Sequence, residues 1–208
     1  MKKAIIFDVD DTLIIWKKEF IGALKKVLTN MNYDFDDNKI NEISDMIDDN
    51  EKYHNKLTRQ ELLNHINNNC NLDLPIEFID KLIVEQGNMY YEDEKLVKVI
   101  KYLSGKYDLY VITNWFTYTQ IKRLENMGIA KYFKKIIGAD QNYIKPDKRS
   151  FDIILSEVPA DNCISIGDTL ENDVILPLSL GMDAYWKTNK KSNKYNTIES
   201  IEELMNIL

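Results

Sequence analysis

The sequence AIIFDVDDTL, residues 4–13, decides the fold and the chemistry of this 208-residue chain. Its first six residues are mostly apolar and rich in β-branched side chains, which predicts a buried strand. Asp8, Asp10 and Asp11 then place three carboxylates within four residues at the end of that strand. Crowded negative charge beside a buried strand costs free energy unless a partner or a cation compensates it. The stretch therefore predicts a functional site at the end of the first strand.

Helical patterns fill residues 15–88. Apolar side chains recur there at spacings of three and four, which places them on one face of a helix. Thr58 and Glu61 form a capping box, a typical helix start, and no strand pattern interrupts the block. We therefore expect an inserted all-helical cap of residues 15–88, and a discontinuous core made of residues 1–14 and 89–208.

Strands and helices alternate after the helical block. Strand patterns are expected at residues 108–113, 135–137, 163–167 and 183–186. Such alternation is typical of a parallel sheet that helices cover on both faces. Together with the first strand, these patterns predict an α/β fold, in which a Rossmann-like three-layer core contains a five-stranded parallel sheet. The last residues, IESIEELMNIL, predict a closing helix.

Polar side chains follow the predicted strands at their carboxyl ends, where open α/β sheets bind their ligands. They are Asp8 and Asp10 after the first strand, Thr113 and Asn114 after the second, Lys145 after the third, and Asp168 and Asp173 after the fourth. Because these strand ends meet at one edge of the sheet, we expect the side chains to converge in one crevice.

The predicted crevice carries an excess of negative charge. Asp8, Asp10, Asp168 and Asp173 bring a formal charge of −4, and Lys145 returns +1. Carboxylates this close stay ionised only beside a compensating cation. Oxygen ligands suit Mg²⁺, which commonly uses one or two carboxylates together with water and substrate phosphate. We therefore expect Mg²⁺ as the cofactor, held by these four aspartates.

Four motifs in this order, FDVDDTL, TN, KP and GDTLEND, resemble those of the haloacid dehalogenase superfamily of phosphohydrolases. The resemblance covers the predicted core, residues 1–14 and about 89–208. A helical insert after the first strand is similar to the helical cap of that superfamily. One such motif alone would be weak, but four in order at spacings that fit a parallel sheet make chance resemblance improbable.

The resemblance implies roles for the aspartates. Asp8 matches the nucleophile, which becomes an aspartyl phosphate, and Asp10 matches the general acid/base. In the superfamily, Mg²⁺ is held by the side chains that match Asp8 and Asp168 and by the backbone carbonyl that matches Asp10. Asp173 would support the metal through its ligands or through water.

The other motif residues match positions that handle phosphate. Thr113 and the Asn114 amide would hold the phosphoryl oxygens, and Lys145 would neutralise charge on the nucleophile and the phosphate. Trp115 follows the TN motif, and we expect it to line the substrate pocket or to pack at the seam between core and cap. Asp11 is interpreted as a residue that stabilises the turn.

The resemblance implies a Mg²⁺-dependent phosphatase that hydrolyses a small phosphorylated metabolite through an aspartyl phosphate. The acidic residue after the second aspartate, the T-x-x-E helix start and the TNWFT stretch are most similar to nucleotidases that act on nucleoside 5′-monophosphates. A phosphoglycolate- or pyrophosphate-type phosphatase is the alternative. The cap is expected to close over the crevice and to select the substrate.

Three other functions share the fold or the motifs. Haloacid dehalogenases generally lack a counterpart of Asp10. Phosphomutases that resemble β-phosphoglucomutase usually have a histidine in the first cap segment, and residues 14–30 contain none. A binding module without catalysis is disfavoured because the motif set is complete. The phosphatase is therefore the preferred interpretation.

Some residues leave local alternatives open. Pro177 kinks the following helix if that helix already runs at Asp173, and is harmless if the helix starts later. His54 and Arg59 are polar residues of the cap, and for both a surface role is favoured over substrate contact.

Composition limits the partners and the location. The formal net charge of −7 argues against a nucleic acid polymer, which requires a basic surface. No apolar run approaches the roughly 20 residues that cross a bilayer, and the N-terminus does not have the pattern of a signal peptide. Cys70 and Cys163 lie far apart, which fits a reducing compartment. We expect a cytoplasmic monomer or homodimer that does not interact with membranes.

Overall fold

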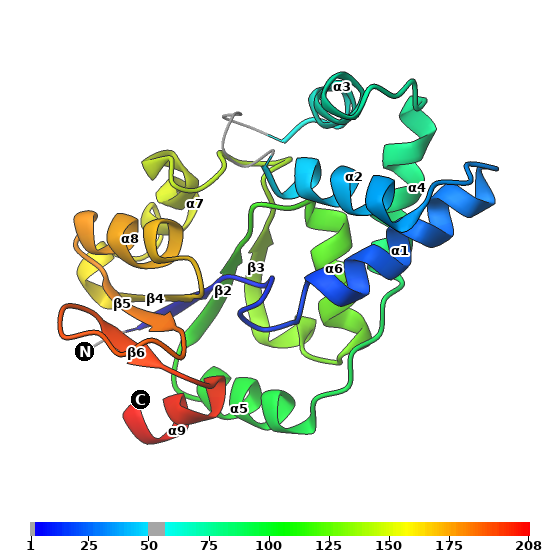
Figure 1. Ribbon diagram of the computed structural model, residues 1–208. Coiled ribbons are helices and arrows are strands. Elements are labelled where there is room, and N and C mark those ends of the chain that lie inside the picture. Colours follow the sequence, from blue (N-terminus) through cyan, green and yellow to red (C-terminus); the bar gives the residue numbers. More distant parts are fainter. Residues whose placement is uncertain (1–2, 50–56) are drawn as a thin grey trace.

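In the computed structural model, which describes residues 3–49 and 57–208, six parallel strands form one sheet at the centre of the core (Figure 1). The strand order is β3-β2-β1-β4-β5-β6, and each neighbouring pair is parallel. The strands are β1 (Ala4–Phe7), β2 (Asp108–Ile112), β3 (Phe133–Ile137), β4 (Cys163–Gly167), β5 (Asp183–Lys187) and β6 (Asn196–Ile198). The strand that carries FDVDDTL therefore lies in the interior of the sheet.

The predicted α/β fold with a parallel sheet is confirmed. The predicted number of five strands is wrong, because the described part of the chain contains six. The additional strand, β6, lies at the sheet edge and pairs with β5. Its three residues are too few to show an alternating pattern. The predicted closing helix is also shorter, because the chain forms a 3₁₀ turn at Ile201–Glu203 before the short helix α9 (Leu204–Ile207).

Helices cover both faces of the sheet, as predicted for a three-layer core. Ile5 and Phe7 of β1 pack on one face with residues of α5, α6 and α9, whereas Ala4 and Ile6 pack on the other face with residues of α7 and α8. This alternation follows from the two-residue period of a strand. The helices are α5 (Glu94–Ser104), α6 (Thr117–Asn126), α7 (Asp152–Leu155) and α8 (Leu176–Ser179).

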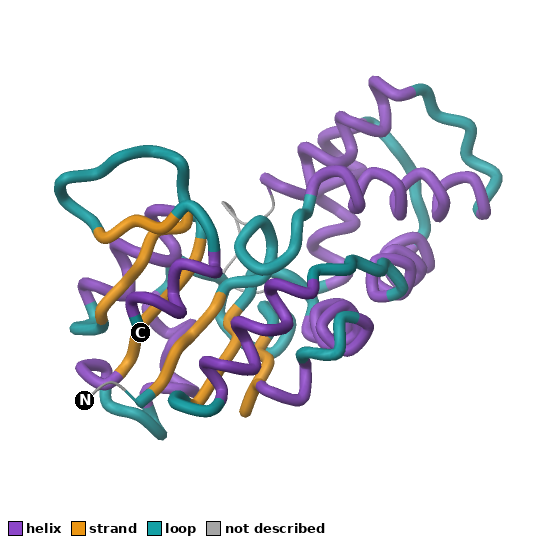
Figure 2. Tube along the Cα trace, turned by 90° about the horizontal axis from the view of Figure 1, so that it is seen from below, coloured by secondary structure: helices purple, strands orange, loops and turns teal. Residues whose placement is uncertain are grey.

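Four helices between β1 and α5 form a helical insert, which lies beyond one end of the sheet (Figure 2). They are α1 (Lys17–Asn30), α2 (Asp37–Asp49), α3 (Arg59–Cys70) and α4 (Ile76–Gly87). Among its described residues the segment 15–88 contains no strand, as predicted. The division of the chain into a core and a separate cap at residues 14 and 88 stays a prediction.

The insert and the core meet at a seam of aromatic rings. Trp16 stacks on Phe20 with the ring centroids 4.4 Å apart, and Trp115 lies edge-on to Trp16 at 5.4 Å. Phe116 contacts Trp115 at 5.2 Å. The Trp115 indole N–H donates a hydrogen bond of 2.7 Å to the Gln86 side chain of α4. The residues that follow the TN motif therefore anchor the insert to the end of β2.

Gly138 makes a close approach possible directly after β3. A Cβ atom at this position would lie 2.4 Å from the Thr117 backbone nitrogen and 2.5 Å from the Trp115 carbonyl oxygen. We expect Gly138→Ala to lower the free energy of unfolding by about 1–3 kcal/mol, because backbone atoms must move apart. Urea unfolding of the two proteins measures this difference.

Gly22 of α1 provides the matched control for this substitution. A Cβ atom there meets nothing within 4 Å, and alanine favours a helix more than glycine does. Gly22→Ala is expected to leave the free energy of unfolding unchanged or to raise it by up to about 1 kcal/mol. Equal effects of the two substitutions would contradict the packing argument.

Candidate active site

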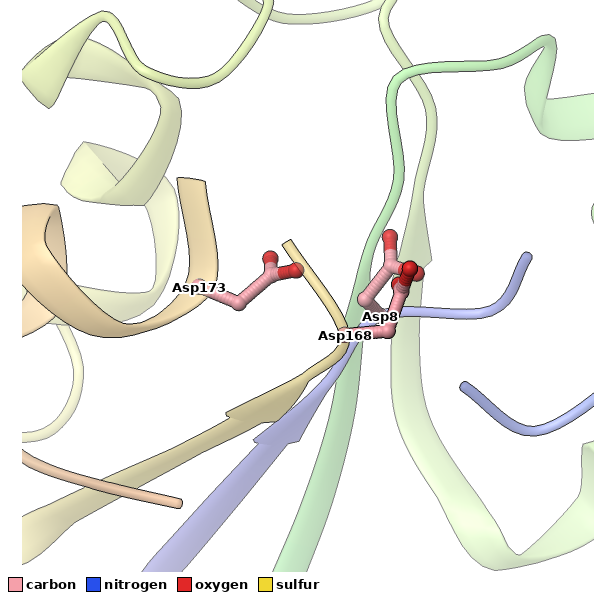
Figure 3. A group of neighbouring side chains, drawn as sticks. All are labelled: Asp8, Asp168 and Asp173. Atoms are coloured by element: carbon pink, nitrogen blue, oxygen red, sulfur yellow. The ribbon is translucent and has the colours of Figure 1, made fainter. Parts of the chain in front are cut away.

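Three aspartates from two neighbouring strand ends and the following turn form an acidic cluster (Figure 3). Asp8 follows β1, Asp168 follows β4, and Asp173 reaches toward both from the π-helical turn Leu170–Ile175. One carboxylate oxygen from each lies within 4.8 Å of the others. The pairing of β1 with β4 brings them together, since the Asp8 backbone N–H donates to the Ile166 carbonyl at 3.0 Å.

Asp173 fits against the end of β4 because residue 167 is glycine. A Cβ atom on Gly167 would lie 2.2 Å from the Asp173 carboxyl carbon, so any other residue would displace this buried side chain. The Thr169 backbone N–H donates to the Asp173 carboxylate at 3.1 Å. The π-helical turn Leu170–Ile175 already runs at Asp173 and leads directly into α8, where Pro177 is the second residue. This is the case in which Pro177 is expected to interrupt the helical hydrogen bonds, and the π-helical turn lies directly before it.

Lys145 joins two of these carboxylates. Its Nζ atom lies 3.0 Å from Asp8 Oδ1 and 2.6 Å from Asp173 Oδ1, and its side chain is only 3% exposed. Burial lowers the pKa of the Lys145 ammonium, but the charges of Asp173 and Asp8 outweigh burial and raise it overall. Lys145 therefore stays protonated and is positioned to offset the negative charge of the cluster.

Asn114 positions Lys145. The side-chain amide of Asn114 donates to the Lys145 carbonyl at 2.9 Å, and the Lys145 backbone N–H donates to the Asn114 side-chain oxygen at 2.8 Å. Both residues are buried, so these bonds hold the loop after β3 against the end of β2. The prediction that the Asn114 amide contacts a phosphoryl group stays a prediction.

One lysine does not neutralise the cluster. Burial raises the pKa of Asp8 well above its ordinary value, and although Lys145 opposes this shift, Asp173 and Asp168 add to it. Burial, followed by the charge of Asp173, raises the pKa of Asp168 to about 6. Oxygen donors with uncompensated negative charge are what a hard divalent ion such as Mg²⁺ requires. Asp8, Asp168 and Asp173 are therefore the side chains that could hold one.

The Asp10 carboxylate lies outside this acidic cluster. Its Oδ1 atom accepts a hydrogen bond from Arg123 at 2.5 Å, and its Oδ2 atom accepts one from Gln120 at 2.5 Å. The family resemblance gives Asp10 a metal-binding role through its backbone carbonyl, which does not require the side chain in the cluster. Asp10 is thus placed two residues from Asp8 with its side chain held by α6.

Gln120 and Arg123 are the site residues that the sequence analysis missed. They lie three residues apart on α6, and Leu124 beside them is buried, so all three belong to the inward face of the helix. The sequence offers little signal for them, because the buried face of α6 is mostly polar, with Thr117, Thr119, Gln120 and Arg123 beside Leu124. Amphipathic patterns alone assign such residues to the solvent side.

Asp11 and Thr12 stabilise the loop after β1. The Asp11 carboxylate accepts from the Trp16 backbone N–H at 2.9 Å, and its backbone has a positive φ of 57°. The Thr12 hydroxyl donates to Asp168 Oδ1 at 3.0 Å. The interpretation of Asp11 as a turn-stabilising residue is confirmed, since it ties the loop to the start of the helical insert.

A cavity of about 260 Å³ opens above the cluster. Core residues form its floor, and the insert contributes the side chains Trp16, Lys17, Ile47 and Asp48. The Trp16 indole N–H donates to Asp48 at 3.1 Å, and Lys17 Nζ lies 2.7 Å from the same carboxylate. Trp115 lines the cavity at the seam and is 6% exposed. A substrate bound at Asp8 would therefore face the insert.

The two polar residues considered in the cap have different outcomes. Arg59 lies on the surface, where it forms an ion pair of 2.9 Å with Asp80. His54 lies outside the described residues. Arg59 does not line the cavity described above.

Comparison with known proteins identifies the family. A family model described as haloacid dehalogenase-like hydrolase matches residues 2–177. The chain belongs to this family. As a haloacid dehalogenase-like hydrolase it has the fold and the class of activity that the four motifs predicted.

Several relatives of this hydrolase have been described. HAD-hydrolase YfnB of Bacillus subtilis (strain 168) is 26% identical, over 99% of this chain and 95% of its own length. A crystal structure of YfnB bound to magnesium has a TM-score of 0.82 at 24% identity, and covers 100% of this chain and 98% of that one. Pyrimidine 5′-nucleotidase YjjG of Escherichia coli (strain K12) is 28% identical over 94 residues, which are 43% of this chain and 42% of YjjG.

The fold recurs in hydrolases of different activity. A 2-haloacid dehalogenase from Pseudomonas syringae pv. Tomato has a TM-score of 0.71 at 19% identity, and covers 100% of this chain and 98% of that one. The fold therefore does not distinguish phosphatase from dehalogenase.

None of the described helices combines the length and the apolar character needed to cross a membrane.

The raised pKa of Asp168 leads to a test of the metal site. Because the folded protein binds the Asp168 proton more tightly than the unfolded chain, stability is lost as the pH rises from about 4 to about 6. We expect Asp168→Asn to raise the Tm of the metal-free protein at pH 7.5 by about 2–4 °C. Mg²⁺ should raise the Tm of the wild type and leave that of the variant unchanged.

Thermal unfolding with and without Mg²⁺ checks both effects. Asparagine keeps an oxygen acceptor for Thr12, so the change is mainly one of charge. Asp37→Asn is the matched control, because Asp37 is exposed and pairs with Lys25 on the surface. A Mg²⁺-dependent rise in Tm that persists in Asp168→Asn would contradict the assignment of Asp168 as a ligand.

Proposed function

We propose that this hydrolase is a Mg²⁺-dependent phosphatase that acts on a small phosphorylated metabolite through an aspartyl phosphate on Asp8. The observation that carries the proposal is the surroundings of Asp8, whose carboxylate lies 3.0 Å from the Lys145 ammonium within an acidic cluster. Asp10 lines the same cavity two residues away. The proposed nucleophile, the proposed general acid/base and the lysine that would offset their charge therefore line one cavity.

Asp8 and Asp10 divide the chemistry between them. An oxygen of Asp8 attacks the phosphorus, the bond from phosphorus to the leaving oxygen breaks, and Asp10 gives that oxygen a proton. In the second step Asp10 takes a proton from a water molecule, whose oxygen attacks the phosphorus. The bond to Asp8 then breaks, phosphate is released, and both aspartates return to their starting states.

The other predicted residues support this transfer. Lys145 offsets charge on Asp8 and on the incoming phosphate, and Thr113 and Asn114 would bind the phosphoryl oxygens. The Asp8 and Asp168 side chains and the Asp10 carbonyl would hold Mg²⁺, with Asp173 in support. When bound, the ion would neutralise charge on the phosphoryl group and help to align it with Asp8.

A nucleoside 5′-monophosphate is the substrate that we propose first. The similarity of part of the chain to a pyrimidine 5′-nucleotidase supports it, as do the TNWFT stretch and the T-x-x-E helix start. The insert lines the cavity with an aromatic ring, a lysine and a carboxylate from Trp16, Lys17 and Asp48, which could contact a leaving group. A phosphoglycolate- or pyrophosphate-type substrate is the alternative.

Asp10 distinguishes this proposal from a dehalogenase. A halide ion leaves carbon without needing a proton, so dehalogenation would give no task to a general acid. In this chain the second aspartate is present, lines the cavity and is bound by two side chains of α6. These contacts favour the transfer of a phosphoryl group from an oxygen leaving group.

Loss of the nucleophile tests the reaction. We expect the wild type to hydrolyse p-nitrophenyl phosphate with Mg²⁺, and Asp8→Asn to lose activity by at least about 1000-fold, because the covalent step is removed. Phosphate release measures the rates, and acid quenching should trap a phosphoenzyme only in proteins that keep Asp8. Asp37→Asn serves as the control and should retain full activity. An inert wild type, or an active Asp8→Asn, would refute the proposed function.

A substrate panel tests the proposed metabolite class. Nucleoside 5′-monophosphates are expected to give a kcat/KM at least about 10-fold above those of phosphoglycolate and sugar phosphates, since specific contacts to the leaving group favour its transition state. Phosphate release at matched concentrations provides the comparison. A preference for phosphoglycolate would replace the nucleotide assignment and leave the reaction class intact.

A further inference from the structure

Both oxygens of the Asp10 carboxylate are occupied by side chains of one helix. Arg123 Nη1 donates to Oδ1 at 2.5 Å, and Gln120 Nε2 donates to Oδ2 at 2.5 Å. With two different partners on its two oxygens, the carboxylate is held in one rotational position. A general acid/base that must reach the leaving oxygen depends on such an orientation.

The orientation of Gln120 is itself defined by its neighbours. Its side-chain oxygen accepts from Arg123 Nη1 at 2.8 Å, which turns its amide nitrogen toward Asp10. The same nitrogen also lies 3.1 Å from the Thr113 hydroxyl. Gln120 thus connects the loop after β1 with the end of β2, the two places that supply the acid/base and a predicted phosphate ligand.

Arg123 is buried to a degree that is unusual for an arginine. Its side chain is 1% exposed, and within the described residues its Nε and Nη2 atoms have no hydrogen-bond partner. Its guanidinium carbon lies 5.5 Å from the centroid of the Trp16 ring, so an aromatic side chain covers it. Burying such a cation is costly, and the Asp10 carboxylate is the anion that compensates it.

A purely structural role does not require this arrangement. Apolar side chains of similar volume often stabilise a buried site as well as an ion pair does. The Asp10 side chain remains 22% exposed and lines the cavity, so the ion pair faces the reaction site. Lys145 contacts Asp8 from the loop after β3, and Arg123 contacts Asp10 from α6, so Asp8 and Asp10 are paired with different cations.

We propose that Arg123 and Gln120 are positioning residues that hold the Asp10 carboxylate toward the leaving oxygen of the substrate. This inference rests on the proposed phosphatase function. A positioning role predicts that loss of Arg123 slows the reaction where proton transfer is needed most. Leaving groups that are poor without a proton will then suffer more than good ones.

Arg123→Met removes the charge and the hydrogen bonds and keeps much of the side-chain volume. We expect its kcat/KM to fall by about 10- to 100-fold for β-glycerophosphate, an alkyl phosphate, and by less than about 3-fold for p-nitrophenyl phosphate. The ratio kcat/KM reports the first irreversible step, which is phosphoryl transfer to Asp8. Arg123→Lys should recover part of the loss, because it restores one charged donor.

A double-mutant cycle separates positioning from a general structural effect. In the Asp10→Asn background, Arg123→Met should cost less than about 3-fold further, since residues that act through one group are not additive. Lys122→Met is the matched control on the same helix, because Lys122 is on the surface and pairs with Glu125. It removes the same charge and should leave kcat/KM unchanged with both substrates.

The outcomes distinguish this inference from the function on which it rests. Equal losses with the two substrates, or full multiplicative losses in the Asp10→Asn background, would overturn the positioning role and leave the phosphatase proposal intact. A wild type that hydrolyses neither substrate would instead refute the proposed function. If Arg123→Met does not fold, as thermal unfolding will show, Gln120→Leu removes the second carboxylate contact and is held to the same two criteria.

Discussion

The buried contact of Lys145 with Asp8 and Asp173 is the interaction on which the site depends. An ammonium or a carboxylate buried without its partner costs several kcal/mol, so neither side of the contact is tolerable alone. Asn114 holds the backbone of Lys145, and the absence of a side chain at Gly167 lets Asp173 approach. The ends of β1, β2 and β4 and the loop after β3 are thereby joined at one point.

The four aspartates of the site carry more negative charge than its two buried cations offset. Asp8, Asp10, Asp168 and Asp173 face two buried cations, Lys145 and the Arg123 of α6, which leaves a formal charge of −2. The excess is concentrated near Asp168, whose pKa is raised to about 6 by burial and then by the charge of Asp173. A divalent cation held by Asp8, Asp168 and Asp173 would supply the missing positive charge.

The helical insert completes the site without contributing to the acidic cluster. Its aromatic residues pack against the segment after the TN motif, and the side chains of α1 and α2 line the cavity above Asp8. The Asp11 carboxylate ties the same loop to the start of α1. The acidic cluster and the insert side chains that line the cavity above it thus come from different parts of the chain, which meet at a short loop.

The order of residues alone predicts the strand that carries Asp8, the polar residues at four strand ends and the helical character of the insert, because all of these depend on local patterns. Strand β6 escaped prediction because three residues at a sheet edge show no period. The sequence analysis also did not predict the hydrogen bonds of Asp10 with Gln120 and Arg123. Sequence patterns place a glutamine or an arginine of a helix on its solvent-exposed face. Only the packing of α6 against the rest of the core brings Gln120 and Arg123 into contact with Asp10. Local periodicity therefore determines the elements and their ends, whereas the contacts between residues more than 100 positions apart depend on how those elements pack.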